Sequence, residues 1–77
     1  MMRKEGIISR FFYNPITRLA MLRFRGSEQV YKLNVPAELQ DLDDLLMTRP
    51  GDKVSVDIDT NDRLDSWFNE TYVMDLN

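Results

Sequence analysis

The stretch that decides the fold is residues 19–35, LAMLRFRGSEQVYKLNV, in which two alternating segments flank a short polar break. In the first segment Ala20, Leu22 and Phe24 point to one side and the residues between them to the other. The second segment alternates in the same way over residues 29–35. Because the Gly-Ser-Glu break is typical of a hairpin turn, the stretch predicts two neighbouring antiparallel strands.

A third strand is predicted upstream of this hairpin. Residues 7–13 (IISRFFY) are rich in the β-branched and aromatic side chains that favour strands. They end at Asn14-Pro15, a good turn signal. Three consecutive strands joined by short turns predict an antiparallel meander over residues 7–35.

Downstream of the meander, the leucine spacing predicts one amphipathic helix. Pro36 suits the first position of a helix, and Arg49-Pro50-Gly51 ends it with a basic residue followed by two breakers. Its apolar stripe consists of Leu39, Leu42, Leu45 and Leu46. A fourth strand follows over residues 54–58 (VSVDI), where apolar and polar residues alternate strictly.

The last segment, residues 62–77, is compatible with two structures. Asn61 and Asp62 both suit the N-cap of a short helix. The side chains at helical spacing in it are Leu64, Trp67, Phe68 and Tyr72. The β-branched residues around Tyr72 equally favour a strand. We expect one domain, residues 1–77, of the α+β class: a small twisted antiparallel sheet (β-β-β-α-β, with a short C-terminal helix as one option) packed on one amphipathic helix, with Trp67 and Phe68 closing the core.

Composition excludes several classes of function. The 77 residues contain no cysteine and no histidine, so disulfides and thiolate metal sites are excluded. The commonest general base is also missing, and no phosphate-cradling glycine loop is present. We therefore expect no enzyme, no cofactor and no metal. No apolar run approaches the roughly 18–20 residues of a membrane span, so we expect no membrane partner and a cytoplasmic location.

Charge is divided unevenly along the chain. Residues 1–33 carry seven Lys or Arg against two acids, a balance of +5. Residues 34–77 carry three Lys or Arg against eleven acids, a balance of −8, and the net charge of the chain is −3. Such asymmetry steers encounters and selects complementary partners, so it bears on binding.

The acidic half supports the first functional hypothesis, a non-catalytic interaction protein. Its expected partner-binding face consists of Glu38, Asp41, Asp44, Asp57, Asp59, Asp62 and Asp65. A continuous negative surface of this kind can occupy a groove built for nucleic acid. We therefore expect a protein partner, and an inhibitor or modulator of nucleic-acid-handling machinery of the sort that phages and mobile elements encode. The bland alternative is a solvated face of a helix and a strand.

The basic half supports a competing hypothesis, direct binding of single-stranded nucleic acid. Its candidate face consists of Arg10, Arg23, Arg25, Lys32, Tyr13 and Tyr31. Aromatic side chains that stack bases, with arginines holding phosphates, are how sheet surfaces bind single strands. The alternative is that these aromatic side chains belong to the core. A third hypothesis is a self-associating structural protein, because a charge dipole permits head-to-tail contact.

Two further acidic arrangements are weaker candidates. Asp57, Asp59, Asn61 and Asp62 resemble the start of a calcium loop, but the sixth position lacks glycine and the twelfth is Phe68 instead of glutamate. Paired catalytic carboxylates need burial to separate their pKa values. The candidate carboxylates lie where periodicity predicts solvent, at Asp41, Asp43, Asp44, Asp57 and Asp59.

Three short motifs follow one another in the order found in a known small module: residues 12–15 (FYNP), 19–26 (LAMLRFRG) and 30–36 (VYKLNVP). About half of the chain resembles the KTSC domain, which is found alone or beside lysyl-tRNA synthetase. A closing Phe-Asn element of that family has a counterpart in Trp67-Phe68-Asn69. The chain differs from the family at Asn14, where the family has Asp, and in the extra segment 52–62. The resemblance implies a fold, and single-stranded nucleic-acid binding is conjectured for the family.

Overall fold

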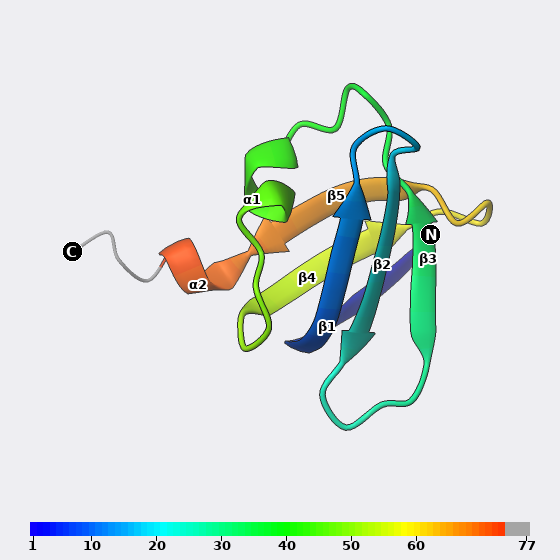
Figure 1. The fold of residues 1–77 in the computed structure, drawn as a ribbon. Helices are drawn as coiled ribbons and strands as arrows, with labels where there is room; N and C mark the ends of the chain where they lie inside the picture. Colours follow the sequence, from blue (N-terminus) through cyan, green and yellow to red (C-terminus); the bar gives the residue numbers. More distant parts are fainter. Residues whose placement is uncertain (74–77) are drawn as a thin grey trace.

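The structure is a computed structural model that describes residues 1–73. The described residues form five strands and two short helices (Figure 1). In chain order these are β1 (Met2–Asn14), β2 (Leu19–Phe24), β3 (Val30–Asn34), α1 (Leu42–Leu46), β4 (Lys53–Ile58), β5 (Leu64–Asn69) and α2 (Glu70–Val73).

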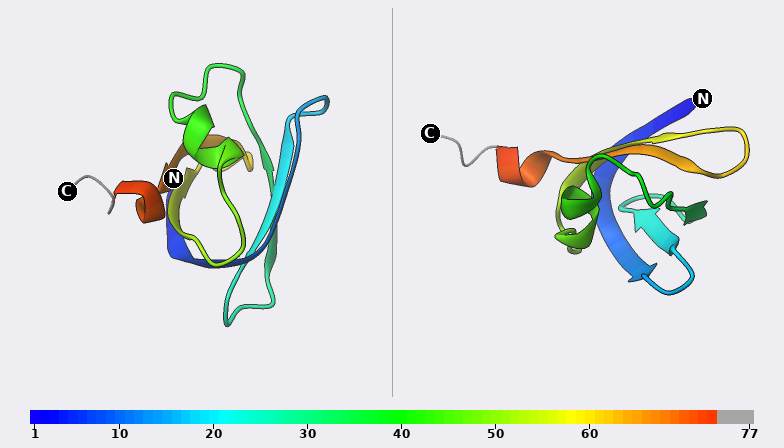
Figure 2. Two further views of the ribbon diagram at one scale, coloured as in Figure 1. Left: turned by 60° about the vertical axis from the view of Figure 1, so that its left-hand side comes forward. Right: turned by 90° about the horizontal axis from the view of Figure 1, so that it is seen from above.

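The five strands form one strongly bent sheet in the order β3-β2-β1-β4-β5. The long strand β1 serves both halves, because residues 2–7 pair with β4 and residues 8–14 pair with β2, each antiparallel. The far edges of the sheet meet at one point, where Asn34 forms a parallel bridge with Arg63 and its N–H donates to the carbonyl of Asp62 at 2.8 Å. The sheet therefore curls towards a partly closed barrel, as the two views in Figure 2 show.

A β-bulge in β1 lies where this strand changes partner. Ile8 pairs with Phe24 and Arg10 pairs with Arg23, so Ser9 is an extra residue with no opposite residue on β2. A bulge bends its strand and increases the local twist. It also shifts the alternation by one residue, because Ile8 is buried inside the sheet whereas Arg10 is exposed on its outer side.

Gly6 gives the bend the space that it needs. It pairs with the buried Val54 and lies against the ring of Phe24. A Cβ at this position would lie 3.0 Å from Phe24 Cδ1, which is tighter than nine in ten Cβ contacts in proteins. Glycine therefore lets the Phe24 ring pack directly onto the β1 backbone.

The core lies between the two halves of the bent sheet. Its buried apolar side chains are Ile8, Ala20, Leu22, Phe24, Leu33, Val35, Leu39, Leu45, Val54, Val56, Ile58, Leu64 and Trp67. Trp67 is 0% exposed, its ring centroid lies 5.4 Å from that of Phe11, and its Nε1 donates to Thr48 Oγ1 at 3.0 Å. Asn69, also fully buried, donates to the same hydroxyl and to Asp52 Oδ2. These bonds fasten the α1–β4 connection to β5.

The predicted meander over residues 7–35 is confirmed, but the predicted fold class is wrong in its helix. The structure is mostly a five-stranded antiparallel sheet, and α1 covers only Leu42–Leu46 and packs against β5 (Figure 1). Aspartate is a poor helix former, and three of them occupy positions 41, 43 and 44. Asp41 has φ −106° and ψ 39° and caps no backbone donor, so the helix begins only after it. Leu39 and Leu45 still reach the core, whereas Leu46 is exposed.

Of the two structures left open for the last segment, the strand is found over Leu64–Asn69 (β5), and a short helix follows only at Glu70–Val73 (α2). Asp57 pairs with Ser66 and Ile58 with Leu64, so Asp65 is an unpaired bulge residue. This bulge places Leu64 and Trp67, three residues apart, on the same buried side, which imitates helical spacing. Phe68 does not close the core as expected: it faces outward and is 42% exposed. The part of the prediction that concerns residues 74–77 lies outside the described residues.

Candidate functional site

The outer side of strands β1, β2 and β3 carries three cross-strand rows of side chains, which we call the basic face. The pairing of β1 with β2 and of β2 with β3 fixes these rows. They are Arg10–Arg23–Val30, Phe12–Met21–Lys32 and Asn14–Leu19–Asn34. Every side chain in the rows is basic, apolar or an amide, so the face contains no carboxylate.

The apolar members of the basic face are unusually open to solvent. Phe12 is 58% exposed, Val30 is 49% exposed and Leu19 is 37% exposed. Large exposed apolar side chains that gather on one side of a small protein mark an interaction surface. The surface therefore combines positive charge with an aromatic ring and aliphatic groups.

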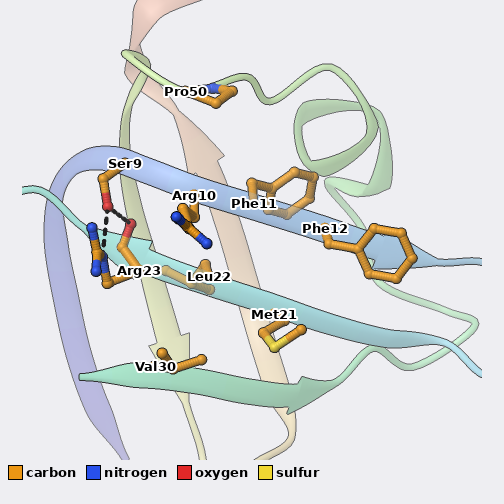
Figure 3. Close-up of a pocket in the computed structure, with 9 residues that line it drawn as sticks. All are labelled: Ser9, Arg10, Phe11, Phe12, Met21, Leu22, Arg23, Val30 and Pro50. Carbon is orange, nitrogen blue, oxygen red and sulfur yellow. Dashed lines mark hydrogen bonds between the residues drawn. The ribbon is translucent and has the colours of Figure 1, made fainter. Parts of the chain in front are cut away.

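A pocket of about 420 Å³ is hollowed into the end of this face near the β1 bulge. Its lining residues are Ser9, Arg10, Phe11, Phe12, Met21, Leu22, Arg23, Val30 and Pro50. Figure 3 shows Arg23 beside Ser9 at one end of the group, and Phe12 with Met21 at the other. Pro50 reaches the pocket from the α1–β4 connection, on the side of β1 that faces away from β2 and β3 and near Arg10.

One arginine of the pocket is held in place and the other is not. Arg23 Nε donates to Ser9 Oγ at 3.1 Å, and the Ser9 hydroxyl donates to the Arg23 carbonyl oxygen at 3.1 Å. Within residues 1–73, neither the Nη groups of Arg23 nor the Arg10 guanidinium has a hydrogen-bond acceptor or a carboxylate partner. The pocket thus presents donors without acceptors.

The basic side chains named from the sequence fall on this surface, and the tyrosines named with them do not. Arg10, Arg23 and Lys32 lie in the rows, and the exposed Arg25 directly follows the end of β2. Tyr13 and Tyr31 pack against the core on the other side of the sheet. Tyr31 meets Phe24 edge-on, with 6.1 Å between the ring centroids.

Sequence reasoning missed the apolar residues of the face, Phe12, Leu19, Met21 and Val30. One signal was available, because adjacent residues of a strand point to opposite sides and only one of Phe11 and Phe12 can be buried. The bulge at Ser9 decides which one, and its position is not visible in the composition of the segment.

Of the predicted acidic face, Asp57 and Asp59 are occupied by contacts within the chain. Asp57 accepts from Arg3 Nε and Nη2 at 2.9 and 3.0 Å and from Ser66 Oγ at 2.8 Å. The Arg3 hydrogen bond, followed by that of Ser66, holds the pKa of Asp57 below its ordinary value. Asp59 accepts from the backbone N–H groups of Arg63 and Asn61, which lower its pKa likewise.

The other acidic residues of that face divide into two groups. Glu38 forms an ion pair with Arg63, and Asp44 Oδ2 accepts from the backbone N–H of Asn69 at 3.0 Å. The exposed carboxylates without a side-chain contact within residues 1–73 are Asp41, Asp62 and Asp65. Four of the seven predicted acids are therefore bound to groups of the chain itself.

The described residues include neither a cluster of metal ligands nor a membrane-spanning helix. Among residues 1–73 no group of three or more acidic side chains is arranged to hold a metal ion, and the calcium-loop candidates Asp57 and Asp59 have the contacts given above. No helix in that range is long and apolar enough to cross a bilayer.

No protein-family model, curated protein or solved structure matches this chain. The resemblance to the KTSC domain stays a prediction from the sequence.

Proposed function

We propose that this chain is a non-catalytic protein that binds single-stranded nucleic acid on its basic face. The observation that carries the proposal is the row Arg10–Arg23, in which two arginines lie directly opposite each other on neighbouring strands. Like charges in this position destabilise a sheet unless an anion lies between them. A phosphate group supplies that charge, and guanidinium groups bind it through two parallel hydrogen bonds.

The apolar part of the face supports a single strand in preference to a duplex. The exposed ring of Phe12 lies between Arg10 and Asn14 on β1 and opposite Met21 on β2. A base can stack on such a ring only when it is not already stacked and paired within a double helix. Stacking on sheet-borne aromatic side chains is tolerant of sequence, because every base has a flat face.

The strand connectivity supports the same proposal. β1 pairs with both β2 and β4, β3 meets β5 in a parallel bridge, and a short helix lies between β3 and β4. This is the order of strands in the five-stranded Greek-key barrel called the OB-fold, whose β2–β3 side binds oligonucleotides. The basic face includes that side. We also propose a cytoplasmic location, since the chain has no cysteine to indicate an oxidising compartment.

The test compares two triple variants that remove the same charge. Arg10→Gln/Arg23→Gln/Lys32→Gln neutralises three cations of the basic face that have no carboxylate partner within residues 1–73. The control, Arg3→Gln/Lys53→Gln/Arg63→Gln, neutralises three cations that are each ion-paired. Binding is measured by fluorescence anisotropy with labelled oligodeoxythymidine and oligouridine of about 12 nucleotides, within the range of sites on such barrels.

We expect the native chain to bind at low salt, with an affinity that falls as salt rises. The basic-face variant should lose at least about tenfold in affinity, and the slope of log affinity against log salt should drop by about 2, which is 0.7 for each of three phosphate contacts. The control should change affinity by less than about twofold. Absence of binding by the native chain at low salt, or equal loss in both variants, would contradict the proposal.

A second candidate function is inhibition of a nucleic-acid-handling protein through acidic side chains. The observation in its favour is the set of exposed, uncompensated carboxylates at Asp41, Asp62 and Asp65. If this is the function, reversing the three to lysine abolishes capture of the protein partner and leaves oligonucleotide binding intact. Self-association, the third hypothesis, predicts a mass above that of the 9.1 kDa chain in dilute salt.

A further inference from the structure

We infer that the pocket at the β1 bulge holds one nucleotide unit of the bound strand, with its phosphate at Arg10 and Arg23 and its base against Phe12 and Met21. The inference rests on the proposed function and adds a place and an orientation to it. The pocket volume, about 420 Å³, lies within the range of sites that enclose a small ligand.

The phosphate end is defined by the bulge. The extra residue Ser9 places its hydroxyl against Arg23 Nε, which fixes the plane of the guanidinium and leaves its Nη groups for a ligand. Arg10 extends from the next position of β1 over the same pocket (Figure 3). Two arginines, one held and one free, with no carboxylate in the lining, form an environment that selects an anion.

The base end is formed by the apolar side chains of Phe12 and Met21, and Pro50 gives the pocket a fixed wall at the other end, beside Arg10 (Figure 3). Pro50 and Gly51 are the central residues of a tight turn, in which the Asp52 N–H donates to the Arg49 carbonyl and Gly51 has φ +98°. The turn is bound to β1, because Gly51 N–H donates to the Ile8 carbonyl at 2.8 Å and Ile8 N–H donates to the Asp52 carbonyl at 2.9 Å. The wall beside the two arginines is therefore in position before a ligand enters.

The polarity of the pocket predicts what it accepts. A nucleotide matches both ends, whereas a nucleoside lacks the anion and inorganic phosphate lacks the base. The probes are uridine 5′-monophosphate, uridine and inorganic phosphate, each titrated into isotopically labelled protein and followed by amide chemical shifts. We expect the monophosphate to move the signals of Ser9, Arg10, Phe12 and Arg23 and to bind at least about fivefold more tightly than either fragment.

Three variants test the two ends separately. Phe12→Leu keeps an apolar side chain and removes the stacking ring, so it should weaken the monophosphate about fivefold or more and leave inorganic phosphate unchanged. Arg23→Gln should weaken both phosphate-containing probes. Ser9→Ala should have a smaller effect of the same kind, which Ser9→Thr should restore, because Ser9 acts by positioning Arg23. Lys53→Gln, on the other half of the sheet, is the matched control for loss of one charge.

Failure of this inference is distinguishable from failure of the proposed function. If oligonucleotides bind in a salt-dependent manner but the monophosphate binds no better than phosphate, or Phe12→Leu has no effect, the pocket assignment is wrong and the basic face stands. If the monophosphate shifts signals on the other half of the sheet, the assignment is likewise overturned. If oligonucleotides do not bind at all, the proposed function fails and this inference fails with it.

Discussion

The two halves of the bent sheet share strand β1, but they differ in the charged groups on their outer sides. Within residues 1–73, cations are paired with carboxylates on one half and have no carboxylate partner on the other. On the β1–β4–β5 half, Arg3 donates two hydrogen bonds to Asp57, and Lys53 Nζ lies 3.4 Å from Glu70 Oε2. On the β1–β2–β3 half, Arg10 and Arg23 face each other with no carboxylate in their row.

The difference shows which surface of the molecule would bind a charged partner. A surface whose charges are compensated within the chain gains little from a partner, because the partner must displace contacts that already exist. A surface whose charges repel one another is stabilised when it binds a ligand of opposite charge. The outer side of β1–β2–β3 is of this second kind.

The largest expected effect comes from breaking the core that the two halves have in common. Trp67→Ala removes a fully buried ring and leaves the Thr48 hydroxyl without its indole donor. We expect the free energy of unfolding to fall by about 3–5 kcal/mol. Urea unfolding followed by far-ultraviolet circular dichroism and by tyrosine fluorescence measures it. The two signals should lose stability together, and separate transitions would show that the halves unfold independently.

A smaller effect is expected where β1 passes from one half to the other. Gly6→Val places side-chain atoms where a Cβ alone would lie 3.0 Å from Phe24 Cδ1. Displacing the Phe24 ring should lower the free energy of unfolding by about 1–3 kcal/mol. The double variant Gly6→Ala/Phe24→Leu relieves the contact and serves as the control. An unchanged stability of Gly6→Val in chemical denaturation would show that the ring does not need this space.

Removal of a single positive charge should change the free energy of unfolding in opposite directions on the two halves. Arg3→Gln loses an exposed ion pair and should lower the free energy of unfolding slightly. Arg10→Gln relieves repulsion with Arg23 and should stabilise the protein by a few tenths of a kcal/mol, within the roughly 0.2–1 kcal/mol of a cross-strand pair. Both are measured by urea unfolding at low salt. Destabilisation by Arg10→Gln would mean that Arg10 has a structural role.

The smallest expected effect is on the stability of the folded protein at acidic pH. The pKa values of Asp57 and Asp59 are lowered in the folded state by the Arg3 side chain and by the Arg63 and Asn61 backbone N–H groups respectively. Their contribution to stability is therefore present above the unfolded value of about 4 and is lost as pH falls through the folded pKa. In Asp57→Asn and Asp59→Asn the loss of stability below about pH 4 should be shallower than in the native chain. A steeper loss would reverse the assignment.

Sequence reasoning found the meander because the segments 19–24 and 30–35 each obey a period of two, on either side of a recognisable turn. It failed where a single bulge residue interrupts the period. Asp65 brings Leu64 and Trp67 onto one side at a spacing of three, and the same spacing is the mark of a helix. Short-range periodicity cannot separate a bulged strand from a helical turn, whereas the pairing with β4 does so.

The candidate site was predictable in its charges and not in its aromatic members. Arg10, Arg23 and Lys32 were assigned to one face from the sequence, and the strand register places them there. Tyr13 and Tyr31 were assigned with them, but a small domain needs most of its large rings inside, and these two pack on the core. The predicted length of the helix was wrong because three of the four residues 41–44 are aspartates, which favour helix poorly. Regular leucine spacing alone does not produce a long helix there.

The bulge adds one residue to strand β1, Ser9, that has no opposite residue on β2. Deleting Ser9 would make Ile8 and Arg10 adjacent, opposite the adjacent residues Phe24 and Arg23, so every other side chain of β1 would keep its side of the sheet. The deletion would instead remove the local bend and the hydroxyl that holds the Arg23 guanidinium. The extra residue therefore sets the curvature of β1 and the position of Arg23, while its neighbours keep their orientation without it.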